Sequence, residues 1–121
     1  MKLVDTDIFI DLLRGFGPSL SFFGEEEEII FSAVTEAELL SGQQCKDAVI
    51  RERVLHFLSQ FEKITVGNPL VQIAADFRRK YGIALPDALI AASAFVNNAT
   101  LITRNVKDFQ KIREIKVEKP Y

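Results

Sequence analysis

Short apolar segments alternate with helix-forming segments along the whole of this chain of 121 residues. Predicted strands lie at residues 3–4, 29–31, 64–66, 100–103 and 114–117. Between them, apolar residues recur at helical spacing over residues 6–14, 32–41, 46–61, 70–81 and 88–97, with a short helical turn at 106–110. Such alternation is typical of a parallel sheet covered on both faces, with all carboxyl strand ends on one edge. We therefore expect a three-layer α/β/α fold with a central parallel sheet of four to five short strands.

Length and charge narrow the possible functions. We expect residues 1–121 to form a single domain, because the chain is short and has no repeat or linker. The net charge of −2 argues against a protein that binds nucleic acid through a global basic field. A nuclease remains possible, since bound metal cations supply positive charge locally.

The sequence also indicates a cytoplasmic protein. Cys45 is the only cysteine, so no internal disulfide can form, which fits a reducing compartment. The N-terminus lacks the pattern of a signal peptide, and the most apolar stretch, residues 88–96, is too short to cross a membrane. His56 is the only histidine and falls on the polar side of its helix, which argues against zinc or triad chemistry based on histidine.

The segment between the first helix and the second strand is rich in aromatic residues. Gly15 and the Gly17-Pro18 pair are expected to end the first helix. Residues 19–23 then carry Leu20 and two phenylalanines, and the acidic run at 25–28 is expected to be a solvated turn.

Acidic residues follow a predicted strand or open a predicted helix at several places. Asp5 and Asp7 follow the first strand, Glu38 lies one turn into the next helix, Asp87 opens the buried helix, and Asp108 follows the fourth strand. Carboxylates that converge on one edge repel one another unless a cation joins them. Oxygen ligands without histidine or cysteine suit Mg²⁺ or Mn²⁺. As a set, these acids indicate a metal-dependent hydrolase of phosphate esters.

Each acid also has a purely structural interpretation. Glu38 can close a capping box with Thr35, and Asp87 and Asp108 stand where helix caps and dipoles favour acids. Asp5 differs, because an acid directly after a buried strand is costly without a partner.

The stretch after the fourth strand is open to two interpretations. Thr103 and Asn105 can bind phosphate or a metal-bound water, or they can be turn residues. Arg104 and Lys107 begin a basic segment that either contacts a phosphate backbone or is a solvated face.

Four motifs in order resemble the PIN-domain nucleases, and within them the VapC-type toxins of prokaryotic toxin–antitoxin pairs. They are Val4-Asp5-Thr6-Asp7, the segments TEAELLSG at 35–42 and LPDALIAASA at 85–94, and LITRNVKDF at 101–109.

The resemblance implies a Mg²⁺-dependent endoribonuclease, Mn²⁺ being an alternative ion, in which metal-activated water attacks the RNA phosphodiester. It implies catalytic roles for Asp5, Glu38, Asp87 and, less securely, Asp108, with Asp5 and Asp87 as metal ligands. Supporting polar residues are Thr6, Thr103 and Asn105, and Arg104 and Lys107 are candidates for RNA binding.

The resemblance also implies two protein partners, namely a second copy of the chain in a homodimer and a small cognate antitoxin. The antitoxin needs an apolar docking surface. The candidates for that surface are four residues that alternatively complete the core: Phe16, Leu20, Phe22 and Phe23.

Three other functions remain open at this point. Asp5-Thr6-Asp7 resembles the motif of haloacid-dehalogenase phosphatases, in which Asp5 would be a nucleophile, although Phe9 stands where that motif usually has Thr or Val. The chain can also be a binding module without catalysis, or a PIN nuclease that processes RNA without being a toxin.

Overall fold

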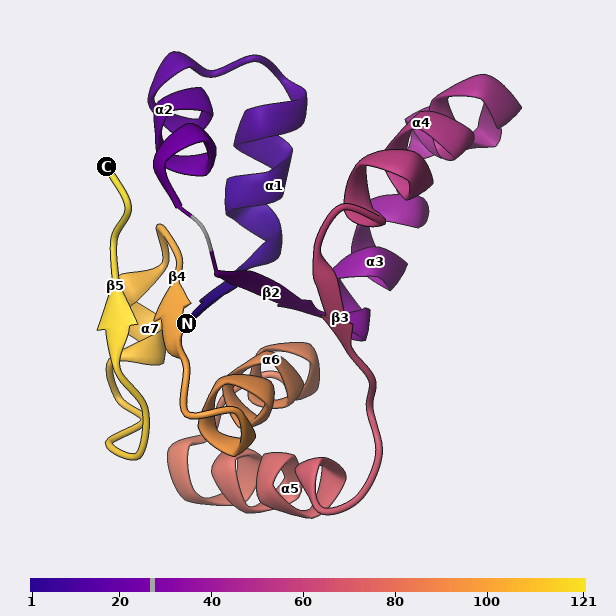
Figure 1. Cartoon of the computed structure of the whole chain (residues 1–121). Helices are drawn as coiled ribbons and strands as arrows, with labels where there is room; N and C mark the ends of the chain where they lie inside the picture. Colours follow the sequence, from indigo (N-terminus) through magenta and orange to yellow (C-terminus); the bar gives the residue numbers. More distant parts are fainter. Residues whose placement is uncertain (27) are drawn as a thin grey trace.

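A parallel sheet lies at the centre of the fold (Figure 1). The computed structural model describes residues 1–26 and 28–121, and within them five strands pair in the order β3-β2-β1-β4-β5. All four pairings are parallel. The strands are β1 (Lys2–Val4), β2 (Ile29–Ser32), β3 (Glu62–Ile64), β4 (Thr100–Ile102) and β5 (Val117–Glu118). The expected α/β fold with a parallel sheet is confirmed.

Helices connect the strands and cover both faces of the sheet (Figure 1). They are α1 (Thr6–Leu13), α2 (Gly17–Glu25), α3 (Ala33–Leu40), α4 (Ala48–Leu58), α5 (Leu70–Tyr81), α6 (Leu85–Val96) and α7 (Val106–Phe109), with a 3₁₀ helix at Gln43–Lys46. None of these described helices is long and apolar enough to cross a membrane. His56 is exposed on α4, as predicted.

Alternate residues of the central strands enter two separate cores, because successive side chains of a strand point to opposite faces. Leu3 of β1 and Leu101 of β4 pack with α5 and α6. Val4 and Ile102, the next residues along, pack with residues of α1, α2, α3 and α4. The near-continuous apolar character of these strands follows from burial on both faces.

Phenylalanines dominate the second core. Phe9 of α1 is fully buried, and its ring centroid lies 5.3 to 6.1 Å from the rings of four others: Phe23, Phe31, Phe57 and Phe61. Edge-to-face and tilted contacts of this kind are favourable beyond the area they bury.

The four candidate docking residues separate into two pairs. Phe22 is 8% exposed, and both Phe22 and Phe23 belong to this core. Phe16 and Leu20 are 47% and 54% exposed. Phe22 and Phe23 therefore take the alternative role of completing the core, whereas Phe16 and Leu20 stay accessible.

Helix α2 was not expected from the sequence. Gly17 and Pro18 were expected only to end α1, but they also form the first turn of α2, where the missing N–H of proline leaves no bond unmade. Glu25 is helical rather than part of a turn. Glu26 pairs with Lys2 at 2.6 Å, and Glu27 lies outside the described residues.

The two edge strands are displaced from their predicted positions. β3 begins at Glu62, two residues before the predicted start, and β5 begins at Val117, three residues after it. Both are short and partly exposed, so their apolar pattern is weak. The position of each edge strand is set by its pairing with the neighbouring strand rather than by its own sequence pattern. For example, β3 takes its register from β2, with Ile30 opposite Glu62.

The strand order reverses at the first strand. β2 and β3 lie on one side of β1, whereas β4 and β5 lie on the other. In open α/β sheets, ligands bind outside the carboxyl ends of the strands where the strand order reverses in this way. Asp5 directly follows β1 at this point, and Thr103 directly follows β4.

Candidate active site

Asp5 and Thr103 are in direct contact at the point where the strand order reverses. The Thr103 hydroxyl donates a hydrogen bond of 2.8 Å to Oδ2 of Asp5. The other carboxylate oxygen, Oδ1, accepts the backbone N–H of Thr6 at 2.8 Å, so Asp5 also caps α1. This contact joins the residues that follow β1 and β4, as expected when the carboxyl ends of neighbouring parallel strands lie on one edge.

The Asp5 carboxyl group is unusually hard to ionise. It is only 7% exposed, and its pKa is raised to about 7, with burial as the largest cause. Within that net shift, the nearby Asp7 charge also raises the pKa, the hydrogen bonds from Thr103 and Thr6 lower it, and Asp87 adds a smaller upward contribution. A cation at this carboxylate would remove most of the cost of its ionisation.

Glu38 is held by Thr6 rather than by its own helix. The Thr6 hydroxyl donates to Oε1 of Glu38 at 2.7 Å and lies 2.9 Å from the hydroxyl of Thr35, which is fully buried. Helix α3 is capped by Ser32, whose hydroxyl accepts the N–H of Val34. The capping-box interpretation of Thr35 and Glu38 is therefore wrong, and Glu38 points toward the residue that follows Asp5.

Asp87 lies among the other acids. It occupies the first turn of α6 and is half-buried. Burial raises its pKa, and the charges of Glu38, Asp108 and Asp7 raise it further. Four acids that are far apart in sequence therefore influence one another electrostatically at Asp87, which is the crowding expected of a cation site.

The segment after β4 lies against this cluster. Asn105 donates its backbone N–H to the Thr103 hydroxyl at 3.0 Å, and its side-chain amide donates to Oδ2 of Asp108 at 3.2 Å. Asn105 stands at the N-cap of α7 without a side-chain capping bond. Asp108 and Lys107 are both exposed.

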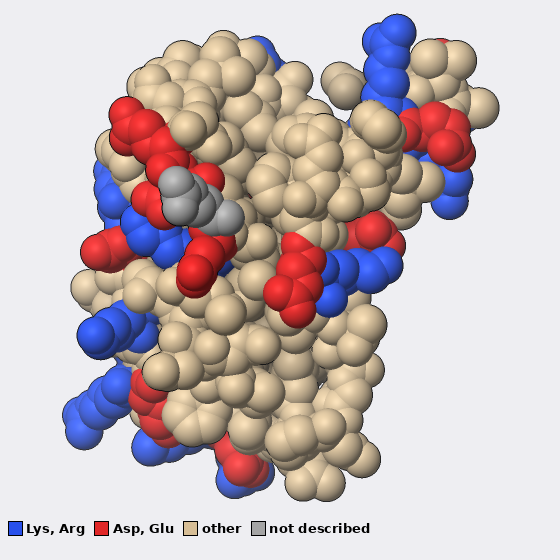
Figure 2. Space-filling view, viewed as in Figure 1, with Lys and Arg blue, Asp and Glu red and all other residues tan. Residues whose placement is uncertain are grey.

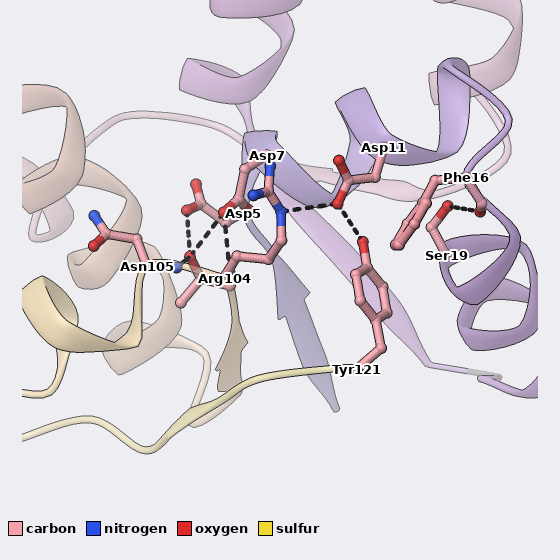
Figure 3. A network of polar contacts seen from close by, with 9 residues as sticks. Asp5, Asp7, Asp11, Phe16, Ser19, Arg104, Asn105 and Tyr121 are labelled. Atoms are coloured by element: carbon pink, nitrogen blue, oxygen red, sulfur yellow. Dashed lines mark hydrogen bonds and ion pairs between the residues drawn. The ribbon is translucent and has the colours of Figure 1, made fainter.

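Asp7 joins helix α1 to the same segment (Figure 3). Its Oδ2 accepts the backbone N–H of Arg104 at 3.0 Å. Its Oδ1 is buried and, within the described residues, has no hydrogen-bond partner. Burial raises the pKa of Asp7, and the backbone bond from Arg104 partly offsets this.

Sequence reasoning missed a second connection on α1. Oδ2 of Asp11 lies 2.8 Å from Nε of Arg104 and accepts the hydroxyl of Tyr121 at 2.6 Å (Figure 3). The four-residue spacing of Asp7 and Asp11 places both on one face of α1, but nothing local pointed to Arg104 or Tyr121.

The acids do not form a closed metal cage. Among the described residues, no three acidic, histidine or cysteine side chains are positioned together so that they could hold an ion. The donor set nevertheless fits a hard divalent cation, because it consists of carboxylate oxygens, raised carboxyl pKa values and one buried oxygen of Asp7 without a partner.

Comparisons with known proteins agree with this arrangement. The PIN domain family model matches residues 2–115. A protein named Ribonuclease VapC19 from Mycobacterium tuberculosis is 33% identical over 130 residues, with both chains fully covered. A Ribonuclease VapC from Rickettsia bellii is 30% identical over 125 residues and covers 95% of this chain and 92% of its own length.

Solved structures show the same fold. A toxin–antitoxin complex from Klebsiella pneumoniae has a chain with a TM-score of 0.86 and 31% identity, covering 100% of this chain and 98% of its own length. The structure of VapBC2 from Rickettsia felis, bound to a DNA fragment from its promoter, has a TM-score of 0.83 and 25% sequence identity. The match covers 98% of this chain and 97% of that one. The family match over nearly the whole chain does not favour the phosphatase alternative and shows that this chain belongs to the PIN-domain family.

Proposed function

We propose that this chain is a metal-dependent endoribonuclease and the toxin of a toxin–antitoxin pair. The observation that carries the proposal is the buried Asp5 at the reversal of strand order, within the electrostatic reach of Asp7 and Asp87. The names of the curated relatives support RNA as the substrate, and solved toxin–antitoxin complexes support a small antitoxin as the partner.

The divalent cation is Mg²⁺ or Mn²⁺, with Asp5 and Asp87 as its protein ligands. When bound, it would activate the attacking water and neutralise charge on the phosphoryl group. Glu38 and Asp108 complete the acidic set, one held by Thr6 and the other by Asn105.

The remaining residues of the site orient the acids and the RNA. Thr103 holds Oδ2 of Asp5 and thereby fixes the carboxylate at the carboxyl end of β1. Arg104 and Lys107 contact RNA phosphates from the segment after β4. No side chain is assigned as a nucleophile, which distinguishes this proposal from phosphatase chemistry through Asp5.

The proposal extends to assembly and location. Residues 1–121 act as one nuclease domain in the cytoplasm, and the active form is a homodimer. The antitoxin docks on exposed apolar side chains, for which Phe16 of the α1–α2 connection and Leu20 of α2 are the candidates.

Cleavage of RNA by the wild-type protein and two isosteric variants tests the catalytic proposal. Asp5→Asn and Asp87→Asn each remove one proposed ligand charge, so we expect cleavage to fall by about 100-fold or more, as losses of charge-stabilising groups do. EDTA should abolish wild-type cleavage, and added Mg²⁺ or Mn²⁺ should restore it.

Two controls accompany this test. Asp76→Asn removes an exposed carboxylate that pairs with Arg79 at 3.0 Å on α5, and it should leave cleavage unchanged. Expression of the wild type should arrest growth, whereas expression of the Asp5 and Asp87 variants should not. Cleavage that survives EDTA or both substitutions would sink the proposal.

A further inference from the structure

Helix α1 holds Arg104 at two points, one turn apart (Figure 3). Asp7 accepts the backbone N–H of Arg104 at 3.0 Å, and Asp11 pairs with Nε of its guanidinium at 2.8 Å. Because Arg104 follows Thr103, which binds Asp5, its backbone lies next to the carboxyl edge of the sheet, and its guanidinium is held by Asp11.

Asp11 is itself held in place. The Tyr121 hydroxyl donates to the same Oδ2 of Asp11 at 2.6 Å, and the Tyr121 ring packs edge-on against Phe16, with centroids 5.5 Å apart. Burial and the Asp11 carboxylate raise the pKa of Tyr121, so the phenol remains a hydrogen-bond donor. The Asp11 side chain is 14% exposed, which makes it the fixed member of the pair.

The guanidinium, in contrast, keeps most of its bonding capacity. Its side chain is 47% exposed, and the pair with Asp11 uses only Nε. In the part of the chain that the structure describes, Asp11 is the only ion-pair partner of Arg104, and neither terminal nitrogen makes a hydrogen bond. An arginine anchored through Nε still presents a planar pair of donors, the geometry that binds a phosphate with two parallel bonds.

We propose that Asp11, supported by Tyr121, is a positioning residue that orients Arg104 to bind a phosphate of the RNA substrate. This inference rests on the proposed ribonuclease function and adds to it how the basic contact is held in place. The alternative is that Asp11 and Arg104 merely tie α1 to the segment after β4.

A double-mutant cycle separates the two possibilities. kcat and KM are measured at fixed Mg²⁺ with a labelled single-stranded RNA for the wild type, Arg104→Ala, Asp11→Asn and the double variant. We expect Arg104→Ala to raise KM about tenfold, because a charge-assisted bond to phosphate is lost. Asp11→Asn should raise KM about threefold, since the guanidinium keeps its charge and loses only its orientation.

The decisive comparison is the effect of Asp11→Asn when Arg104 is already alanine. A positioning role predicts that KM then stays the same or falls, because a negative charge near the RNA has been removed and no arginine remains to orient. A structural tie predicts that Asp11→Asn increases KM or lowers kcat in both backgrounds, and that result would overturn the inference.

Tyr121→Phe provides a milder variant that keeps every charge. It should raise KM about twofold at unchanged kcat, because one hydrogen bond to Asp11 is lost. Asp76→Asn is the matched control, since Asp76 also pairs with an arginine, Arg79, but on the exposed face of α5. Wild-type protein that does not cleave RNA refutes the proposed function, whereas cleavage with no change in KM on Asp11→Asn refutes only this inference.

Discussion

At the scale of single residues, the carboxyl group of Asp5 is the acid whose ionisation is most costly in the folded protein. Its carboxyl group is buried at the end of β1 and is bonded by two neutral donors, the Thr6 N–H and the Thr103 hydroxyl. Neutral donors offset part of the cost of burying a charge but not all of it, which is why its pKa rises to about 7. The pKa values of Asp7 and Asp87 are also raised.

This shift predicts that the metal-free protein loses stability as the pH rises. In the unfolded chain Asp5 ionises near its ordinary value of 3.8, whereas in the folded chain it keeps its proton up to about pH 7. The folded state therefore binds more protons in this window, and the stabilisation present below pH 3.8 is lost as the pH rises through 7. We expect the melting temperature without metal to fall between pH 5 and pH 8.

Two comparisons check the origin of this effect. Asp5→Asn cannot ionise, so its melting temperature should fall less over the same range. Mg²⁺ should raise the melting temperature of the wild type more at pH 8 than at pH 5, because protons compete with the cation for the carboxylates. Equal pH slopes for wild type and variant would show that Asp5 does not titrate in this window.

The sequence allowed Asp5 to be predicted but not the way Glu38 is held. An acid after an apolar strand needs a partner, and that argument required only local sequence. At Glu38, the local pattern from Thr35 to Glu38 is equally compatible with a capping box. The actual partner, Thr6, is 32 residues away in the chain, so only the packing of α1 against α3 decides between them.

At the scale of elements, helix α1 links the core to the site. Ile8 and Phe9 are fully buried on its inner side, while Asp7 and Asp11 face the segment after β4. The prediction of α1 succeeded because its apolar residues recur at helical spacing within one short segment. Helix α2 was missed because its glycine-proline start resembles the end of α1, and β3 was shifted because charged residues begin it.

The aromatic core makes Phe9 the side chain on which α1 depends most. Phe9→Ala would leave a cavity among four aromatic rings, and we expect it to lower the free energy of unfolding by about 3–5 kcal/mol. Leu20→Ala on α2 is the matched control. Leu20 is 54% exposed, so its truncation should cost less than about 0.5 kcal/mol.

Urea denaturation measures both values. Similar losses for the two variants would mean that Phe9 is not the centre of this core. A large loss for Phe9→Ala alone would show that the aromatic core depends on this side chain, as expected in a small domain that needs large apolar side chains to bury enough surface.

At the scale of the whole molecule, charge opposes the binding of RNA. The net charge is −2, and the charges of Glu38, Asp108 and Asp7 act on Asp87, at the site where we propose that the phosphodiester binds. The face seen in Figure 2 mixes Lys and Arg with Asp and Glu and presents no continuous basic patch. The proposed enzyme therefore depends on its cation for attraction as well as for chemistry.

This dependence predicts that Mg²⁺ reverses which protein binds RNA more tightly, the wild type or a double variant. Without divalent metal, Asp5→Asn combined with Asp87→Asn should bind RNA more tightly than the wild type, because two negative charges near the phosphates are gone. With Mg²⁺, the wild type should bind more tightly, because only it holds the cation that joins carboxylates to phosphate. Fluorescence anisotropy with a 2′-O-methyl RNA, measured at constant ionic strength with and without Mg²⁺, tests this order. If the wild type binds equally well with and without Mg²⁺, the acids at the end of β1 and at the start of α6 do not hold the ion that brings RNA to the site.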